Sequence, residues 1–173
     1  MKLALVVTGL VAVCGLGRAT LVAQAAPQTA TAAAGTLTIA GDVAKPLTLT
    51  LAELKAMPRT SASVREETRT INYEGVLVTD ILSRAGAPTG GQMRSPALTM
   101  YVVATAKDGY QVVLSFGELD NPLSNANIIV ADVMDGQPLP ANVGPLRLIL
   151  PKDARSVRSV RMLERLEVVQ LKK

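Results

Sequence analysis

The sequence Asp135-Gly-Gln-Pro-Leu-Pro140, followed by Gly144-Pro-Leu-Arg-Leu-Ile-Leu-Pro151, decides the fold of this chain. Asp-Gly indicates a tight turn, because glycine takes a positive φ at no steric cost and aspartate tolerates it. The prolines keep the following segment extended. The leucines at 146, 148 and 150 then alternate with Arg147 and Ile149, which predicts a strand with a buried leucine face and with Arg147 on the opposite face.

The chain after this strand is strongly basic. From Arg147 to the end there are eight Lys/Arg and three Asp/Glu, and the loop after Pro151 carries Arg155, Arg158 and Arg161. Planar guanidinium groups suit phosphate or carboxylate, so one interpretation is an anion site. The other interpretation is a solvated basic face, the usual meaning of a run of charge.

The Gly144–Pro151 motif with Arg158-Ser-Val-Arg161 resembles the closing motif of the sulfite oxidase-like molybdopterin-binding family, in its small periplasmic form. Those members read Gly-x-Pro-x-Arg-Leu-Val-Val-Pro and then Lys-x-x-Lys. The resemblance implies a pterin and phosphate site on Arg147, Arg158 and Arg161, which we expect to converge on one cleft. Arginine replaces lysine at the two later positions, and Gly and Pro are adjacent here.

A second run, from Tyr73-Glu-Gly75-Val-Leu to Arg84-Ala-Gly86, also resembles this family. Members that carry molybdenum place a thiolate ligand about a dozen residues before the matching glycine, and that spacing falls near Ser63. Serine does not replace the soft thiolate that binds the metal. The resemblance therefore implies a cofactor-binding fold in which molybdopterin can bind and no metal is expected. Ser63 is either a residue that hydrogen-bonds the ligand or an ordinary strand serine.

The first 25 residues have the pattern of a secretory signal. Lys2 precedes an apolar run over residues 3–17, and Ala23-Gln-Ala25 is a small-x-small cleavage site. We expect a signal peptide over residues 1–25, a disordered Ala/Thr-rich leader over 26–34, and one domain over 35–173 in the periplasm or outside the cell. The alternative is an uncleaved anchor, although the run is short for a span of about 20 residues.

Composition excludes several classes of function. The chain has no histidine and a single cysteine, Cys14, which signal cleavage would remove. Zinc, haem, copper and iron–sulfur sites and imidazole-dependent nucleophiles lack their usual ligands in such a chain. With three Tyr, one Phe and no Trp, a base-stacking surface is not expected. Because removal of residues 1–25 also leaves a nearly neutral chain, we expect no binding to nucleic acid. We also expect no stable membrane insertion once the signal is cleaved.

The remaining pattern predicts an α+β, β-rich domain with a few short helices, a sulfite oxidase-type molybdopterin-binding fold. Strands are expected at residues 36–39, 60–71, 101–107, 110–114, 127–132 and 162–169. A capping box at Thr50-Leu-Ala-Glu53 predicts a short helix before Pro58. A turn at Tyr73–Gly75 should lead into a second helix that ends at Gly86. Asp108-Gly109 predicts a hairpin turn. Asp108 either serves only to form this turn or faces a ligand.

Three functions fit these observations. The first is a molybdopterin-dependent oxidoreductase. The second is an exported, non-catalytic domain that kept the fold and a basic cleft for a phosphate-bearing, pterin-like ligand or for a periplasmic protein partner. The third is a carboxylate hydrolase, for which no spacing among Glu66, Glu67, Glu74 and Asp80 selects a pair of acids. We favour the second and leave open whether the protein is an enzyme.

Overall fold

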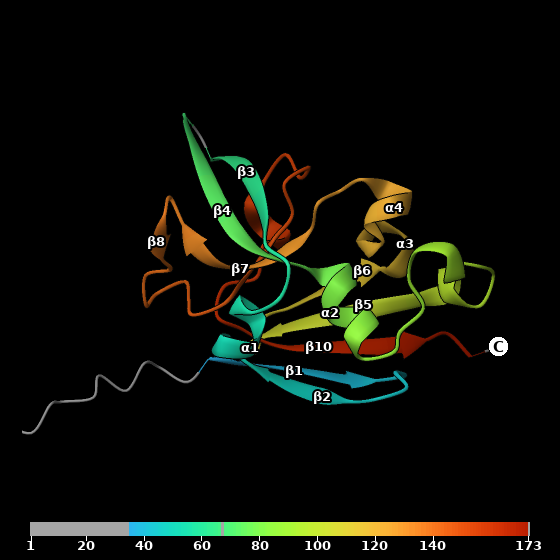
Figure 1. The fold of residues 1–173 in the computed structure, drawn as a ribbon. Helices are drawn as coiled ribbons and strands as arrows, with labels where there is room; N and C mark the ends of the chain where they lie inside the picture. The colour runs from blue at the N-terminus through green and yellow to red at the C-terminus, as the bar shows by residue number, and fades with distance from the viewer. Residues whose placement is uncertain (1–34, 67, 173) are drawn as a thin grey trace, which may run out of the picture. The chain divides into compact units, whose positions relative to one another are not determined.

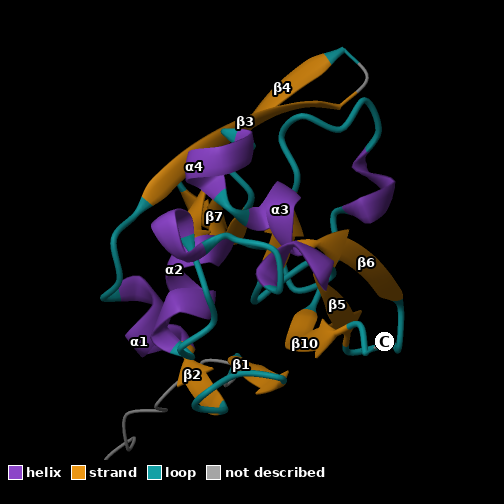
Figure 2. Cartoon of the chain, turned by 90° about the vertical axis from the view of Figure 1, so that its right-hand side faces the viewer, coloured by secondary structure: helices purple, strands orange, loops and turns teal. Residues whose placement is uncertain are grey.

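The computed structural model describes residues 35–66 and 68–172, all within one compact unit. The expected signal peptide, the leader and Cys14 lie outside the described residues. Two sheets form this unit, and short helices lie beside them (Figures 1 and 2). The prediction of a strand-rich α+β domain is therefore confirmed. None of the helices in the described part has the length and apolar character needed to cross a membrane.

The first sheet has the order β2-β1-β10-β5-β6. Its strands are β1 (Thr36–Gly41), β2 (Leu47–Thr50), β5 (Met100–Ala106), β6 (Gln111–Ser115) and β10 (Leu163–Gln170). The strand β1 pairs in parallel with β10, while the other neighbours are antiparallel. Alternate residues of β5 are buried, so one face of this sheet lies on the core.

The second sheet has the order β3-β4-β7-β8, and β9 also pairs with β7. Its strands are β3 (Thr60–Glu66), β4 (Arg69–Leu77), β7 (Ile129–Met134), β8 (Gln137–Pro138) and β9 (Arg147–Ile149). Asp135 and Gly136 both have positive φ in the turn after β7, as the Asp-Gly pair predicted. The hairpin of β3 and β4 extends well beyond the rest of this sheet (Figure 1).

Short helices connect the strands. They are α1 (Leu51–Lys55), α2 (Val78–Arg84), α3 (Phe116–Leu119) and α4 (Asn121–Ser124), with 3-10 turns η1 (Gly90–Gln92), η2 (Ala97–Thr99) and η3 (Ser156–Arg158). The predicted capping box at Thr50 and Glu53 is present, and its hydrogen bonds lower the pKa of the Glu53 carboxyl. The helix α2 ends before Gly86, which has a positive φ as expected.

The core has two parts. The main cluster includes side chains of both sheets and of α1, α2 and α3, whereas the smaller cluster includes Val64, Tyr73 and Ile149 in the second sheet. Leu146, Leu148 and Leu150 belong to the main cluster, as the alternation predicted. Arg147 and Ile149 are buried too. The strand β9 is therefore covered on both faces, and Arg147 is not the exposed basic group that an anion site required.

One predicted boundary was wrong. The segment expected as a single strand over residues 60–71 is a hairpin, and β4 continues through the turn expected at Tyr73–Gly75. The pairing of β4 with β7 shifts register between Glu74 and Gly75. A Cβ atom at Gly75 would lie 2.1 Å from the carbonyl oxygen of Val130, so glycine permits close approach of two strands here and does not form a turn.

This contact gives a stability prediction. Gly75→Ala should lower the free energy of unfolding by about 1–3 kcal/mol, because the added methyl group meets backbone atoms of β7 that cannot move independently. Gly91→Ala is the control, since nothing lies within 4 Å of a Cβ there. Urea unfolding of both variants measures the difference, and equal stability would contradict the close approach.

Candidate functional site

Three ion pairs hold the β3–β4 hairpin. Arg59, just before β3, pairs with the buried Asp132 at 2.5 Å. Arg69 at the start of β4 pairs with Asp135. The hydrogen bond from the Asn72 amide lowers the pKa of the Asp135 carboxyl, and Arg69 lowers it further. The third pair joins Arg147 and Glu66 (3.1 Å). The hairpin is therefore attached near both of its ends.

The Arg147 side chain is only 4% exposed. Its Nη1 donates a hydrogen bond to the Tyr73 hydroxyl (2.6 Å), and its guanidinium carbon lies 5.2 Å from the centre of the Tyr73 ring. The Nε atom is buried and has no partner among the described residues. Burial raises the pKa of Tyr73, while Arg147 acts in the opposite direction. Arg147 thus joins β9 to the hairpin and does not present its charge to solvent.

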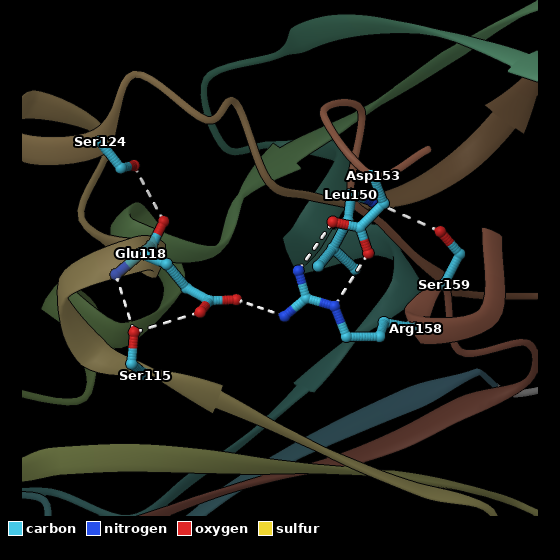
Figure 3. Close-up of polar contacts among 7 residues, drawn as sticks. All are labelled: Ser115, Glu118, Ser124, Leu150, Asp153, Arg158 and Ser159. Atoms are coloured by element: carbon cyan, nitrogen blue, oxygen red, sulfur yellow. Dashed lines mark hydrogen bonds and ion pairs between the residues drawn. The ribbon is translucent and has the colours of Figure 1, made fainter. Parts of the chain in front are cut away.

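Arg158 is bound by carboxylates of the protein itself (Figure 3). Its Nε and Nη2 donate to both oxygens of Asp153 (2.9 and 2.7 Å), and its Nη1 donates to Glu118 (2.7 Å). Glu118 is in turn held by the Ser115 hydroxyl at the start of α3. The bond to Asp153 is the main cause of a raised Arg158 pKa, with Glu118 adding to it. All three nitrogens of this guanidinium are therefore used within the fold.

Arg161 is exposed and lies beside an open cavity of about 540 Å³, which we call the arginine cavity. The hairpin and the loop between β9 and β10 form its walls. Its lining residues are Arg65, Glu66, Thr68, Arg69, Ile71, Ala154, Arg155, Ser156 and Arg161. Among residues 35–66 and 68–172, no ion pair involves Arg65, Arg155 or Arg161. Within the described residues, these three guanidinium groups thus have no carboxylate paired with them.

The four residues predicted from the sequence do not share one cavity. Arg161 lines the arginine cavity, Arg158 lines a separate one of about 240 Å³, and Arg147 is buried beneath the hairpin. Ser63 is exposed on β3, where its hydroxyl donates to the Asn72 side chain opposite it (2.7 Å). The expected convergence of Arg147, Arg158 and Arg161 was therefore wrong. Two of these arginines are held by carboxylates of the fold, and only the third remains for a ligand.

Sequence reasoning left Arg65, Arg69 and Arg155 out of the site. Arg155 stood in the same basic loop as Arg158, and Arg65 and Arg69 stood in a polar segment that also suited a site-lining strand. What was missing was the hairpin turn, which places the end of β3 and the start of β4 against residues 154–156. Carboxylates at 66, 118, 135 and 153 then determine which arginines are neutralised.

The arginine cavity fits the phosphate end of molybdopterin better than its metal end. Guanidinium and hydroxyl groups, which are donors to phosphate, form most of its polar lining, and the one carboxylate there, Glu66, is paired with Arg147. No cysteine occurs in residues 35–172, and the chain has no histidine. In that same part of the chain there is no cluster of three or more acidic, His or Cys side chains that could hold a metal ion. The lining of the arginine cavity suits an anion and contains no thiolate or thioether to bind a soft metal.

Comparison with known proteins gives one family and one fold. The model of the oxidoreductase molybdopterin binding domain family matches residues 23–173. No curated protein matches the chain. The crystal structure of the sulfane dehydrogenase SoxCD from Paracoccus pantotrophus is similar, with a TM-score of 0.62 and 18% identity. The match covers 80% of this chain and 39% of that one, and at this identity it shows the fold alone.

The buried arginine gives a second prediction. Arg147→Lys should lower the free energy of unfolding by about 1–3 kcal/mol, because one ammonium group cannot keep the contacts to both Tyr73 and Glu66. Arg165→Lys is the matched control, since its pair with Glu167 is 43% and 42% exposed and should contribute about 0–1 kcal/mol. Urea unfolding compares the two variants. Equal losses would show that Arg147 has no special structural role.

Proposed function

Because the chain belongs to the oxidoreductase molybdopterin binding domain family, we propose that it binds a phosphate-bearing, pterin-like ligand in the arginine cavity. We further propose that it does so without molybdenum redox catalysis. The observation that carries the proposal is the set of Arg65, Arg155 and Arg161 around one cavity, with no ion pair to any described residue. Phosphate offers the several acceptor oxygens that such a set can bind.

The arrangement of charge supports phosphate over a solvated basic face. Two arginines of this region are paired with carboxylates, Arg69 with Asp135 and Arg147 with Glu66, whereas Arg65, Arg155 and Arg161 have no ion pair to a described residue. Arg65 and Arg69 come from the hairpin, whereas Arg155 and Arg161 come from the loop before β10. Mutual repulsion would drive these side chains apart on a free surface. A bound dianion would offset this repulsion and would bridge the two segments.

The proposal places the protein outside the cytoplasm. Its basis is the sequence pattern of residues 1–25, with Lys2, an apolar run and the Ala23-Gln-Ala25 site. In this proposal the binding domain works in the periplasm, either as a carrier of a small ligand or beside a protein partner that supplies the chemistry. An active molybdenum enzyme is the second candidate, and the family match favours it. The absence of cysteine from residues 35–172 supports the first candidate, since a thiolate is the soft ligand expected for the metal.

The first test concerns the arginines. Arg155→Gln with Arg161→Gln should weaken binding of a pterin phosphate at least about tenfold, which corresponds to about 1.4 kcal/mol. Well-formed charge-assisted hydrogen bonds contribute about 1.5–3 kcal/mol each, so even a partial loss suffices. Arg84→Gln with Arg94→Gln is the control, because it removes the same charge from exposed positions outside the cavity. Calorimetric titration at fixed salt gives both affinities. An equal loss of affinity in the two double variants would show that the arginines act only through the net charge of the protein.

The second test concerns the metal. Protein purified from its native compartment should contain no stoichiometric molybdenum, because the position that matches the thiolate ligand is Ser63. Elemental analysis beside a cysteine-bearing family member measures this directly. Molybdenum near one atom per chain would contradict the non-catalytic proposal and favour the second candidate.

A further inference from the structure

The strand β6 ends the first sheet (Figure 2), and its outer edge has no partner strand among the described residues. On its inner side, the Ala106 amide donates to the Tyr110 carbonyl oxygen, and Val112 pairs with β5 two residues further on. Residues that bond to the neighbouring strand alternate in an antiparallel pair. Gln111 and Val113 therefore point their backbone N–H and C=O groups away from β5. These groups are placed to bond to a further strand.

The outer edge of β6 carries none of the features that usually prevent the addition of a strand. Other end strands have them, since β8 is two residues long and contains Pro138, β3 carries Arg65 and Glu66, and β2 follows Lys45-Pro46. Short length, charge and proline all oppose pairing at an edge. The sequence of β6, Gln-Val-Val-Leu-Ser, has no charge, proline or glycine. The edge is therefore suited to pairing with another chain.

Exposed apolar side chains gather around β6. Val113 lies at the centre of the strand and is 60% exposed. Gly117 follows the strand by two residues, and a Cβ atom there would lie 3.7 Å from the side chains of both Leu98 and Leu123. These two leucines, which are 54% and 61% exposed, therefore lie beside the end of β6.

Two more exposed apolar side chains lie at the start of the strand. Tyr110 directly precedes β6, and its hydroxyl donates to the Val157 carbonyl oxygen (2.8 Å). Contiguous apolar groups on a surface indicate an interaction site, whereas single ones do not. Five of the six exposed large apolar side chains in the described part are thus on β6 or at its ends, the full set being Leu98, Tyr110, Val113, Leu123, Val157 and Leu171.

We propose that β6 pairs with β6 of a second copy of this chain, antiparallel and about a two-fold axis at Val113. In such a pair the start of one strand lies beside the end of the other. Tyr110 and Val157 of one copy then meet Leu98 and Leu123 of the second copy, and the same contact is repeated on the other side of the axis. A strand without charge also meets no like charge when it pairs with itself.

The two-fold axis fixes the register of the pair. Val113 lies opposite Val113 of the second copy, and Gln111 lies opposite Ser115. Because Val113 also pairs with Val103 on β5, four valines form one row across the two joined sheets. Specific interfaces bury about 800 Å² on each partner. A strand of five residues supplies only part of this area, so the apolar groups at its ends complete the surface.

The first test is sedimentation velocity of the purified protein at increasing concentration, which should show a monomer and a dimer in equilibrium. Val113→Lys should weaken the dimer at least about tenfold, because two ammonium groups then lie opposite each other in place of an apolar contact. Thr48→Lys is the control, since it adds the same charge at an exposed position of β2, the other end strand of this sheet, and should leave the dimer unchanged. Thermal melting confirms that both variants are folded.

The second test is a disulfide at the axis, made in chains in which Cys14, the only native cysteine, is replaced by serine. Val113→Cys should form a covalent dimer with oxidised glutathione, because opposed residues of a bonded antiparallel pair have Cα atoms about 5.5 Å apart, within the range of a disulfide. Gln111→Cys should cross-link at least about tenfold more slowly, since its two copies lie about 14 Å apart along the strands.

Several results would overturn the inference. A protein that stays monomeric at every concentration would exclude the second copy and leave the edge to an extended segment of another protein. A dimer that responds equally to Val113→Lys and Thr48→Lys, or equal cross-linking at positions 113 and 111, would place the contact elsewhere. No residue that lines the arginine cavity lies on β6, so neither test depends on the proposed function.

Discussion

The attachment of the β3–β4 hairpin by buried and half-buried arginines is the constraint on which the site depends. Arg147 is covered on every side, and its charge is met by Glu66 and by the Tyr73 hydroxyl and ring. Removing one partner of such a pair leaves a buried polar group without compensation. Because Glu66 also lines the arginine cavity, the same contact that holds the hairpin fixes one wall of the site.

The arginines around the loop before β10 and the hairpin fall into two groups, those paired with a carboxylate and those without such a pair among the described residues. Arg147 and Arg158 have carboxylates of the fold against them, so their charge is neutralised before any ligand arrives. Arg65, Arg155 and Arg161 have no such partner among the described residues and remain exposed. A bidentate pair such as Arg158 with Asp153 fixes the loop before β10 at one point. Arg155 and Arg161 stand on either side of this attachment in the sequence and line the arginine cavity.

Features that depend on residues close together in the sequence were predicted correctly, whereas features that depend on distant residues were missed. The Asp135-Gly136 turn, the Thr50 capping box and the β5–β6 hairpin depend on neighbouring residues, and all three are present. The hairpin at residues 60–77 was missed because Gly75 resembles a turn residue, while its real role is contact with β7, some 55 residues away along the chain. Arg158 has one partner nearby, Asp153, five residues before it, but the other carboxylate partners of Arg147 and Arg158 are distant in sequence. Glu66 and Glu118 lie 81 and 40 residues away, and no pattern along the chain relates such pairs.

The lack of a thiolate in residues 35–172 is compatible with an anion site built from arginines. Ser63, near which the resemblance places the thiolate of other members, donates its hydroxyl to the Asn72 side chain across the hairpin. The arginine cavity is built from the end of the same hairpin and from the loop before β10, and Ser63 is not part of its lining. A substitution at Ser63 would therefore leave the lining of the arginine cavity unchanged, so the metal and the phosphate parts of the proposed function can be tested separately.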